Sequence, residues 1–161
     1  RGGEGLYGVV HFETRAVGVV PYEAGDIWLV GQYRFPLGAY SWEIPEGGAL
    51  ASEDIDGCAR RELTEETGLV ADELTPLCTL HLSNSVTDEV GYVFLATGLR
   101  SGTASPDETE ELAVRRLPLE EAYALVLRGE ITDSMSIIAI FRLMLLAREG
   151  KLPGTGASSA P

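Results

Sequence analysis

Three glutamates lie within five residues near the middle of the chain, in the stretch RRELTEETGL that spans residues 60–69. If this stretch is helical, Glu62 and Glu66 stand one turn apart on one face, with Cβ atoms about 5–6 Å from each other. At an effective dielectric constant of about 20, two carboxylates at that distance repel each other by about 3 kcal/mol. A divalent cation bound between them reverses the sign, and carboxylate oxygens are ligands that Mg²⁺ selects. The spacing therefore indicates either a cation site or, as is common for Glu-rich helices, a solvated acidic face.

A calcium-binding EF-hand loop is a second metal site that this acidic region suggests, in the segment SEDIDGCARREL (52–63). Such a loop needs an acidic ligand at its first position and a bidentate glutamate at its twelfth. Ser52 and Leu63 occupy these positions. The EF-hand interpretation is therefore excluded.

The glutamates also belong to a longer pattern. Along the chain it consists of a glycine, five residues, a glutamate, seven residues and then RELxEExGL: Gly47, Glu53 and residues 61–69. This pattern resembles the Nudix box, the signature of hydrolases that act on a nucleoside diphosphate linked to another group. Every constrained position is filled, and chance agreement in a chain of this length is negligible.

The resemblance implies a loop–helix–loop that holds Mg²⁺ or Mn²⁺. The implied metal ligands are three carboxylates and one main-chain carbonyl, those of Glu62, Glu65, Glu66 and Glu46. Arg61 and Glu53 are expected to pair and so to orient the helix and its ligands. These residues and the three glutamates of the helix form the expected catalytic set.

The flanking segments resemble the ADP-ribose pyrophosphatase branch of the family. They are GQYR (31–34), WEIPEGG (42–48) and SNSVTDE (83–89), and the resemblance extends from residue 6 to about residue 148. Position 46 departs from the branch, which usually has alanine where this chain has glutamate, and the departure leaves the exact sugar open. Asn84 likewise replaces a proline.

This closer resemblance implies further roles. Arg34 is the candidate for a phosphate contact, although an exposed arginine at a strand end needs no such role. Glu43 and Glu89 are candidates for contacts to substrate hydroxyls, or they solubilise the edges of loops. Glu110 is expected to be the base or to complete the metal cluster, with Glu108 as the next candidate, against the alternative of a solvated loop.

The function that follows is divalent-metal-dependent hydrolysis of ADP-ribose, or a related nucleoside diphosphate sugar, to a nucleoside monophosphate and a sugar phosphate. GDP-mannose, a dinucleotide or a coenzyme pyrophosphate are alternative substrates, and a nucleotide-sensing domain without turnover is an alternative class. Trp28 and Trp42 could stack on adenine, but a tryptophan in a strand more often belongs to the core. His11 and His81 receive no role.

The elements that must position these residues follow from periodicity and turn signals. Strands are expected at 6–12, 16–22, 27–34, 41–44, 74–83, 89–99 and 113–117, and helices at 52–67, 118–128 and 134–148. Ser52 is the expected N-cap of the first helix, and Gly68 can end it. The fold class is α/β (α+β), a mixed β-sheet between helices, and the resemblance implies that it is of the Nudix type. One domain, 1–150, is followed by a tail, 151–161, whose composition predicts disorder.

Composition limits the partners. A net charge of −13 argues against a nucleic-acid polymer, which binds through clustered Lys and Arg. The longest apolar tract, 136–147, is too short to span a membrane. Cys58 and Cys78 form no metal or disulfide motif, which favours a reducing compartment such as the cytoplasm. The resemblance also implies a homodimer, with an N-terminal strand region represented here only by its end, residues 1–15.

Overall fold

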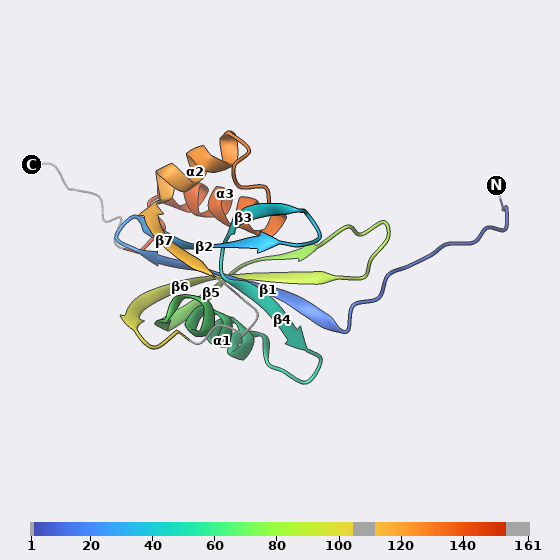
Figure 1. Cartoon of the computed structure of the whole chain (residues 1–161), viewed down its shortest axis with the longest axis horizontal. Coiled ribbons are helices and arrows are strands. Elements are labelled where there is room, and N and C mark those ends of the chain that lie inside the picture. Colours follow the sequence, from blue (N-terminus) through green and yellow to red (C-terminus); the bar gives the residue numbers. More distant parts are fainter. Residues whose placement is uncertain (1, 105–111, 154–161) are drawn as a thin grey trace, which may run out of the picture.

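The structure is a computed structural model that describes residues 2–104 and 112–153. Its strands are β1 (Thr14–Glu23), β2 (Asp26–Arg34), β3 (Ala39–Glu43), β4 (Glu46–Leu50), β5 (Leu69–His81), β6 (Val90–Ser101) and β7 (Ala113–Pro118). Its helices are α1 (Ile55–Thr67), α2 (Leu119–Leu127) and α3 (Ser134–Arg148). The mixed sheet lies between α1 on one side and α2 with α3 on the other (Figure 1). The predicted fold class is therefore confirmed.

Strand β1 joins the two halves of the sheet. It pairs in parallel with β6 and antiparallel with β4, with Gly18 opposite Glu46. At its far end it turns into β2, and β2 carries β3 on one edge and β7 on the other. Because β4 leads directly into α1, and the β2–β3 hairpin lies on the other half, β1 holds these segments beside each other.

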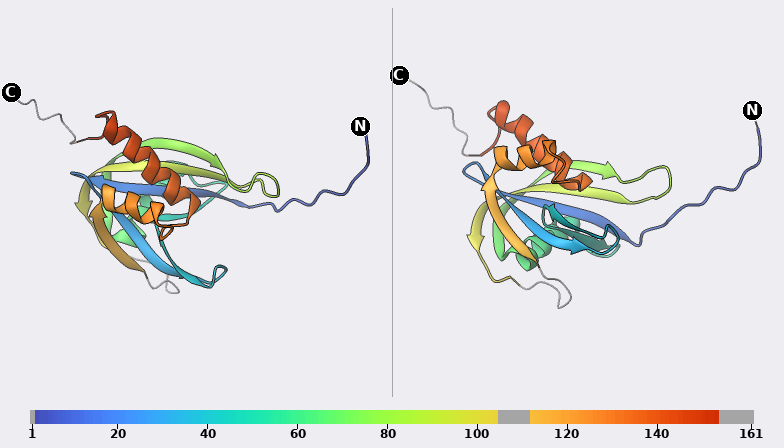
Figure 2. Two further views of the ribbon diagram at one scale, coloured as in Figure 1. Left: turned by 90° about the horizontal axis from the view of Figure 1, so that it is seen from above. Right: turned by 45° about the horizontal axis from the view of Figure 1, so that its top comes forward.

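Two hydrophobic cores lie on opposite faces of the sheet. Val17 and Val19 of β1 face α1, where they join Ala59 and Leu63. Val20 belongs to the larger core, which contains most of the apolar side chains of α2 and α3. A strand that is buried on both faces reads as a continuous apolar run, and residues 16–22 show such a run. Helix α3 crosses this face of the sheet in the views of Figure 2.

Four of the expected elements differ from the structure by more than two residues, and one of them is the strand expected at 74–83, because β5 begins at Leu69. Residues 6–12 are not a strand, because they pair with the rest of the described chain only at one bridge, between Val10 and Thr87. The segment 46–50, expected to be loop because of its glycines, forms β4. Helix α1 begins at Ile55 rather than near Ser52, since Asp54 is the N-cap and accepts a hydrogen bond from Gly57 N.

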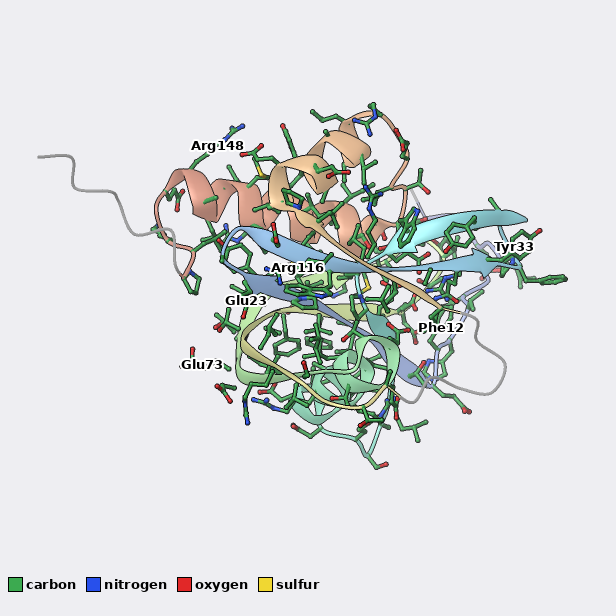
Figure 3. All side chains as sticks on the ribbon, turned by 60° about the vertical axis from the view of Figure 1, so that its left-hand side comes forward. Phe12, Glu23, Tyr33, Glu73, Arg116 and Arg148 are labelled. Atoms are coloured by element: carbon green, nitrogen blue, oxygen red, sulfur yellow. The ribbon has the colours of Figure 1, made fainter. Side chains whose placement is uncertain are left out.

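Two further observations concern the ends of the chain and its surface. Leu152 is buried in the larger core, whereas residues 154–161 lie outside the described residues, so the disorder expected for the tail stays a prediction. Tyr33 of the β2–β3 hairpin points away from the body (Figure 3). In the described part of the chain, none of the helices has both the length and the hydropathy for crossing a bilayer.

Candidate active site

Helix α1 is a fixed platform for the three glutamates. Its N-terminus is capped by Asp54, and Gly68 ends it with φ of 70°, in the left-handed region that glycine adopts without strain. Ala59 and Leu63 are fully buried against the sheet. This packing sets the rotation of the helix and turns Glu62 and Glu66 towards β4, where their exposed fractions are 8% and 5%.

The backbone of β4 closes over these two carboxylates. A Cβ atom added at Gly47 would lie 2.0 Å from Glu62 Oε1, so any side chain at this position would displace that carboxylate. The main-chain N–H of Glu46 donates to Glu66 Oε2 at 3.1 Å. A pocket of about 280 Å³, the carboxylate pocket, lies here, lined by Glu46, Gly47, Gly48, Arg61, Glu62, Glu65 and Glu66.

Arg61 is the main counter-charge in the carboxylate pocket. Its Nε lies 3.0 Å from Glu53 Oε1, and its Nη1 donates to Glu62 Oε1 at 2.7 Å and to Glu65 Oε2 at 2.9 Å. The hydrogen bond that Arg61 donates to Glu53 raises the pKa of Arg61, and the same bond lowers the pKa of Glu53. The expected Arg61–Glu53 pair is therefore present, and its orienting role stays a prediction.

Cys58 adds a neutral group to this cluster that the sequence analysis did not single out. Its Sγ lies 3.4 Å from Arg61 Nη2 and 3.9 Å from Glu62 Oε1. Burial raises the pKa of the Cys58 thiol to about 12, and the neighbouring Glu62 adds to the shift. The thiol therefore stays protonated at neutral pH and contributes no negative charge.

Arg34 lies across β4 from the carboxylate pocket. Its Nε donates to both oxygens of Glu43, at 3.1 and 3.0 Å, and its Nη2 donates to Glu43 and, at 3.1 Å, to Glu46 Oε1. Glu43 is 3% exposed and raises the pKa of Arg34. Glu43 thus anchors the guanidinium, whereas Nη1 makes no hydrogen bond or ion pair to residues 2–104 and 112–153 and can serve a ligand.

Two pockets meet at Arg34 and Glu46. The first has a volume of about 290 Å³ and is lined in part by Glu89; it is called the Glu89 pocket here. The second, about 510 Å³, lies beside the β2–β3 hairpin and is called the hairpin pocket; it contains Glu43. Asp133, the N-cap of α3, lines both. The structure thus brings the three expected substrate-binding residues, Arg34, Glu43 and Glu89, to adjoining pockets.

Glu46 is the residue that all three pockets share. Burial raises the pKa of Glu46 well above its ordinary value of 4.5, and the negative charges of Asp133 and Glu43 add to that rise, while Arg34 opposes it. Its Oε2 is buried and accepts no hydrogen bond from the described part of the chain. The sequence pattern had assigned a role only to the carbonyl of this residue, although it marked position 46 as a departure from the related branch.

Other expected site residues lie elsewhere or outside the described ranges. The guanidinium of Arg116 packs over Trp28, with its Cζ atom 4.6 Å from the centroid of the Trp28 ring. Trp42 makes an edge contact with Tyr40. Neither tryptophan lines the three pockets. Glu110, together with Glu108, falls in residues 105–111, which the structure does not describe.

A divalent cation fits the chemistry of the carboxylate pocket but not its present side-chain arrangement. The donors are hard oxygens, and two of their carboxylates are nearly buried. Within residues 2–104 and 112–153, however, no three His, Cys, Asp or Glu side chains converge as a ready coordination shell. Glu62 and Glu65 instead share Arg61. Coordination would thus require rotation of glutamate side chains away from Arg61.

Comparison with known proteins agrees with this geometry. Residues 13–136 match the sequence model of the NUDIX domain family. The chain is 38% identical over 136 residues to an ADP-ribose pyrophosphatase of Mycobacterium tuberculosis, covering 82% of this chain and 65% of the relative. It is 37% identical over 125 residues to an ADP-ribose pyrophosphatase of Bacillus subtilis, covering 76% and 68% of the two chains.

A solved structure shows the same architecture. The crystal structure of an ADP compounds hydrolase superposes with a TM-score of 0.78 and 25% sequence identity, covering 88% of this chain and 77% of that one. The chain spans about two thirds of the length of the curated relatives named above. The glutamate-bearing helix beneath β4, the sequence match and the superposition lead to one conclusion: the chain belongs to the Nudix family.

Proposed function

We propose that this protein hydrolyses the pyrophosphate bond of a nucleoside diphosphate sugar, with ADP-ribose as the preferred substrate, in a reaction that depends on Mg²⁺ or Mn²⁺. The observation that carries the proposal is the adjacency of the carboxylate pocket and the Arg34 side chain on either side of Glu46. One part can hold a cation and the other an anion. A pyrophosphate group needs both, because its charge must be balanced on a protein surface of net charge −13.

The residues that would hold the metal are Glu62, Glu65 and Glu66 together with the carbonyl of Glu46. When bound, a divalent ion neutralises phosphate oxygens and lowers the pKa of a coordinated water. Glu62 and Glu66 supply the negative charge that retains it, and Arg61 balances that charge. Members of the Nudix family generally need such an ion.

The remaining residues bind and orient the substrate. Arg34 offers Nη1 to a phosphate oxygen while Glu43 holds the rest of its guanidinium in place. Glu89 and Glu43 are proposed to contact sugar hydroxyls, and Glu110 is proposed as the base that takes the proton of the attacking water. Addition of one water across the pyrophosphate bond gives two products, a nucleoside monophosphate and a sugar phosphate.

The names of the relatives support this substrate class, since two of them are ADP-ribose pyrophosphatases. A small molecule, rather than a nucleic-acid polymer, remains the proposed partner. We also propose a cytoplasmic location, supported by two free cysteines, and a homodimer. Light scattering on the purified chain measures the latter directly.

A substrate panel tests the function. The purified protein is incubated with ADP-ribose, GDP-mannose, a dinucleotide and a coenzyme pyrophosphate, with Mg²⁺, with Mn²⁺ and with a chelator. We expect AMP and ribose phosphate from ADP-ribose, with the highest kcat/KM of the panel and no turnover with chelator. Preferred cleavage of GDP-mannose would show that GDP-mannose, and not ADP-ribose, is the preferred substrate. Binding without cleavage of any compound would favour a nucleotide-sensing domain instead.

A further inference from the structure

We propose that the side chain of Glu46 determines the specificity of the site, by favouring an uncharged, hydroxyl-bearing sugar over a further phosphate charge beside the pyrophosphate. This inference rests on the proposed function and names the chemical group that the site selects. It concerns the carboxylate of Glu46, which is distinct from the main-chain carbonyl proposed as a metal ligand.

The backbone of β4 separates these two roles. Side chains alternate along a strand, and the missing side chain of Gly47 would point at Glu62 of α1. The side chain of Glu46 therefore leaves the opposite face, where its Oε1 meets Arg34 at 3.1 Å. It borders the Glu89 pocket and the hairpin pocket as well as the carboxylate pocket. A substrate that spans the metal and Arg34 must pass this carboxylate.

One carboxyl oxygen of Glu46 lacks a hydrogen-bond partner among the described residues. Its Oε1 is engaged by Arg34, but its Oε2 is buried and accepts no hydrogen bond from any described residue. A buried polar atom without a partner is unfavourable, and most such atoms in proteins find a donor. A sugar hydroxyl can supply that donor if the side chain rotates to expose Oε2, and because a hydroxyl both donates and accepts, it can pair with Glu46 in either protonation state. A phosphate oxygen has no proton to donate, so it cannot pair with the ionised form.

The charges around Glu46 also favour an uncharged sugar over an additional phosphate. Across the Glu89 and hairpin pockets the lining contains one cationic side chain and four carboxylates: Arg34, and Glu43, Glu46, Glu89 and Asp133. One guanidinium, already paired with Glu43, can balance a pyrophosphate oxygen but not an additional phosphate charge. Uncharged hydroxyls, in contrast, are attracted to carboxylate acceptors.

A competing explanation is that Glu46 acts only by positioning Arg34. The two explanations differ in what they predict for ADP, which lacks the terminal sugar and carries more negative charge than ADP-ribose. Loss of a positioning residue should weaken the binding of both ligands by a similar factor. Loss of a specificity residue should weaken the binding of ADP-ribose and strengthen the binding of ADP. Arg34→Lys, which keeps the charge but loses the paired hydrogen bonds of the guanidinium to Glu43, provides the comparison for an effect that acts through Arg34.

The experiment measures kcat and KM for ADP-ribose, and the inhibition constant for ADP, with Mg²⁺. The proteins are the wild type, Glu46→Ala, Glu46→Gln, Arg34→Lys and, as control, Glu130→Gln, an exposed carboxylate outside the three pockets described above. We expect the ratio of the ADP inhibition constant to the ADP-ribose KM to fall about tenfold or more in Glu46→Ala. Glu46→Gln should lie between it and the wild type, and Glu130→Gln should match the wild type.

An unchanged ratio in both Glu46 variants overturns the inference, as does the same fall of the ratio in Glu46→Ala and Arg34→Lys. Thermal unfolding checks the fold, and Glu46→Gln decides the result if Glu46→Ala does not fold. A wild type that cleaves ADP-ribose while the ratio stays fixed removes only this inference. A wild type that cleaves no nucleotide sugar removes the proposed function and this inference with it.

Discussion

Gly47 shapes the candidate site by lacking a side chain. A Cβ atom there would lie 2.0 Å from Glu62 Oε1 and 2.2 Å from its Cδ, inside any permitted contact distance. Because Glu62 is nearly buried, its carboxylate has little room to move aside. A methyl group at position 47 should therefore displace a proposed metal ligand.

Gly47→Ala tests this contact. We expect kcat/KM for ADP-ribose to fall by about tenfold or more, since misplacement of a reacting group by about 1 Å can cost about a hundredfold. Steady-state kinetics at saturating Mg²⁺ measures the effect. Wild-type kinetics in this variant would show that the proximity of Gly47 to Glu62 has no functional consequence.

Glu66→Gln removes the charge of a proposed ligand and keeps its shape. The amide oxygen can still accept the hydrogen bond from Glu46 N, and the repulsion between positions 62 and 66 is relieved, so the melting temperature should not decrease. Turnover should fall by at least about a hundredfold, because even residues that only support metal ligands contribute tenfold to a hundredfold. Glu73→Gln, which lies on β5 and points outward (Figure 3), is the matched control.

At the scale of elements, α1 carries a glycine that its structure does not require. Gly57 is exposed, and a Cβ atom there would meet only ordinary contacts with Asp54, at 3.7 Å. Gly57→Ala should raise the free energy of unfolding by about 0.5–1 kcal/mol, because alanine loses less backbone entropy in a helix. Chemical denaturation measures this change. Unchanged activity in the same variant would show that the loss in Gly47→Ala reflects its position and not glycine replacement in general.

An ion pair that depends on pH attaches the N-terminal segment to the loop between β5 and β6. His11 Nδ1 lies 2.5 Å from Asp88 Oδ2, and Phe12 N donates to Asp88 Oδ1 at 3.1 Å. Asp88 raises the pKa of His11 above its ordinary 6.5, and His11 lowers the pKa of Asp88 below its ordinary 3.8. The His11 contribution is complete below pH 6.5 and is lost as the pH rises through the raised value. The Asp88 contribution is complete above pH 3.8 and is lost as the pH falls through the lowered value.

The attachment should therefore be strongest between about pH 3.8 and pH 6.5. Nuclear magnetic resonance of the His11 ring should give a midpoint above 6.5 in the wild type and a lower one in Asp88→Asn, with His81→Gln used to assign the signals. Equal midpoints in the wild type and Asp88→Asn would mean that the pair does not form in solution.

The sequence predicted elements where the pattern was local and missed those that depend on distant partners. The helix expected at 52–67 and its end at Gly68 follow from periodicity and glycine chemistry, and both are observed, apart from a start at Ile55. Strand β4 was missed because two glycines normally signal a turn. Only the pairing of β4 with β1 and the closeness of Glu62 show why glycine is required at position 47.

The same distinction holds for the site. The proximity of the glutamates of α1 could be predicted from the sequence because all three lie within one helix. The arrangement of Arg34 between Glu43 and Glu46, and the approach of Asp133 from the start of α3, depend on the β2–β3 pairing and on packing across the sheet. No pattern along the chain specifies those distances. Trp42 carries no sequence signal that separates a stacking platform from a core side chain, and it packs against the larger core.

At the scale of the whole molecule, a net charge of −13 makes the protein an unfavourable partner for an anionic substrate unless a cation intervenes. The fold concentrates part of that charge beneath β4, where Glu62 and Glu66 are nearly buried. Their repulsion is reduced by Arg61 in the described structure, and a divalent ion would reduce it further. We therefore expect metal uptake to be coupled to substrate binding.

Calorimetric titration of the purified protein with Mn²⁺ tests this claim most directly, comparing the wild type with Glu66→Gln and with the control Glu73→Gln. The account predicts saturable binding in the wild type and in Glu73→Gln, and binding weakened by at least about tenfold in Glu66→Gln. Equal Mn²⁺ affinity in all three proteins, or no binding by the wild type in the presence of ADP-ribose, would contradict it.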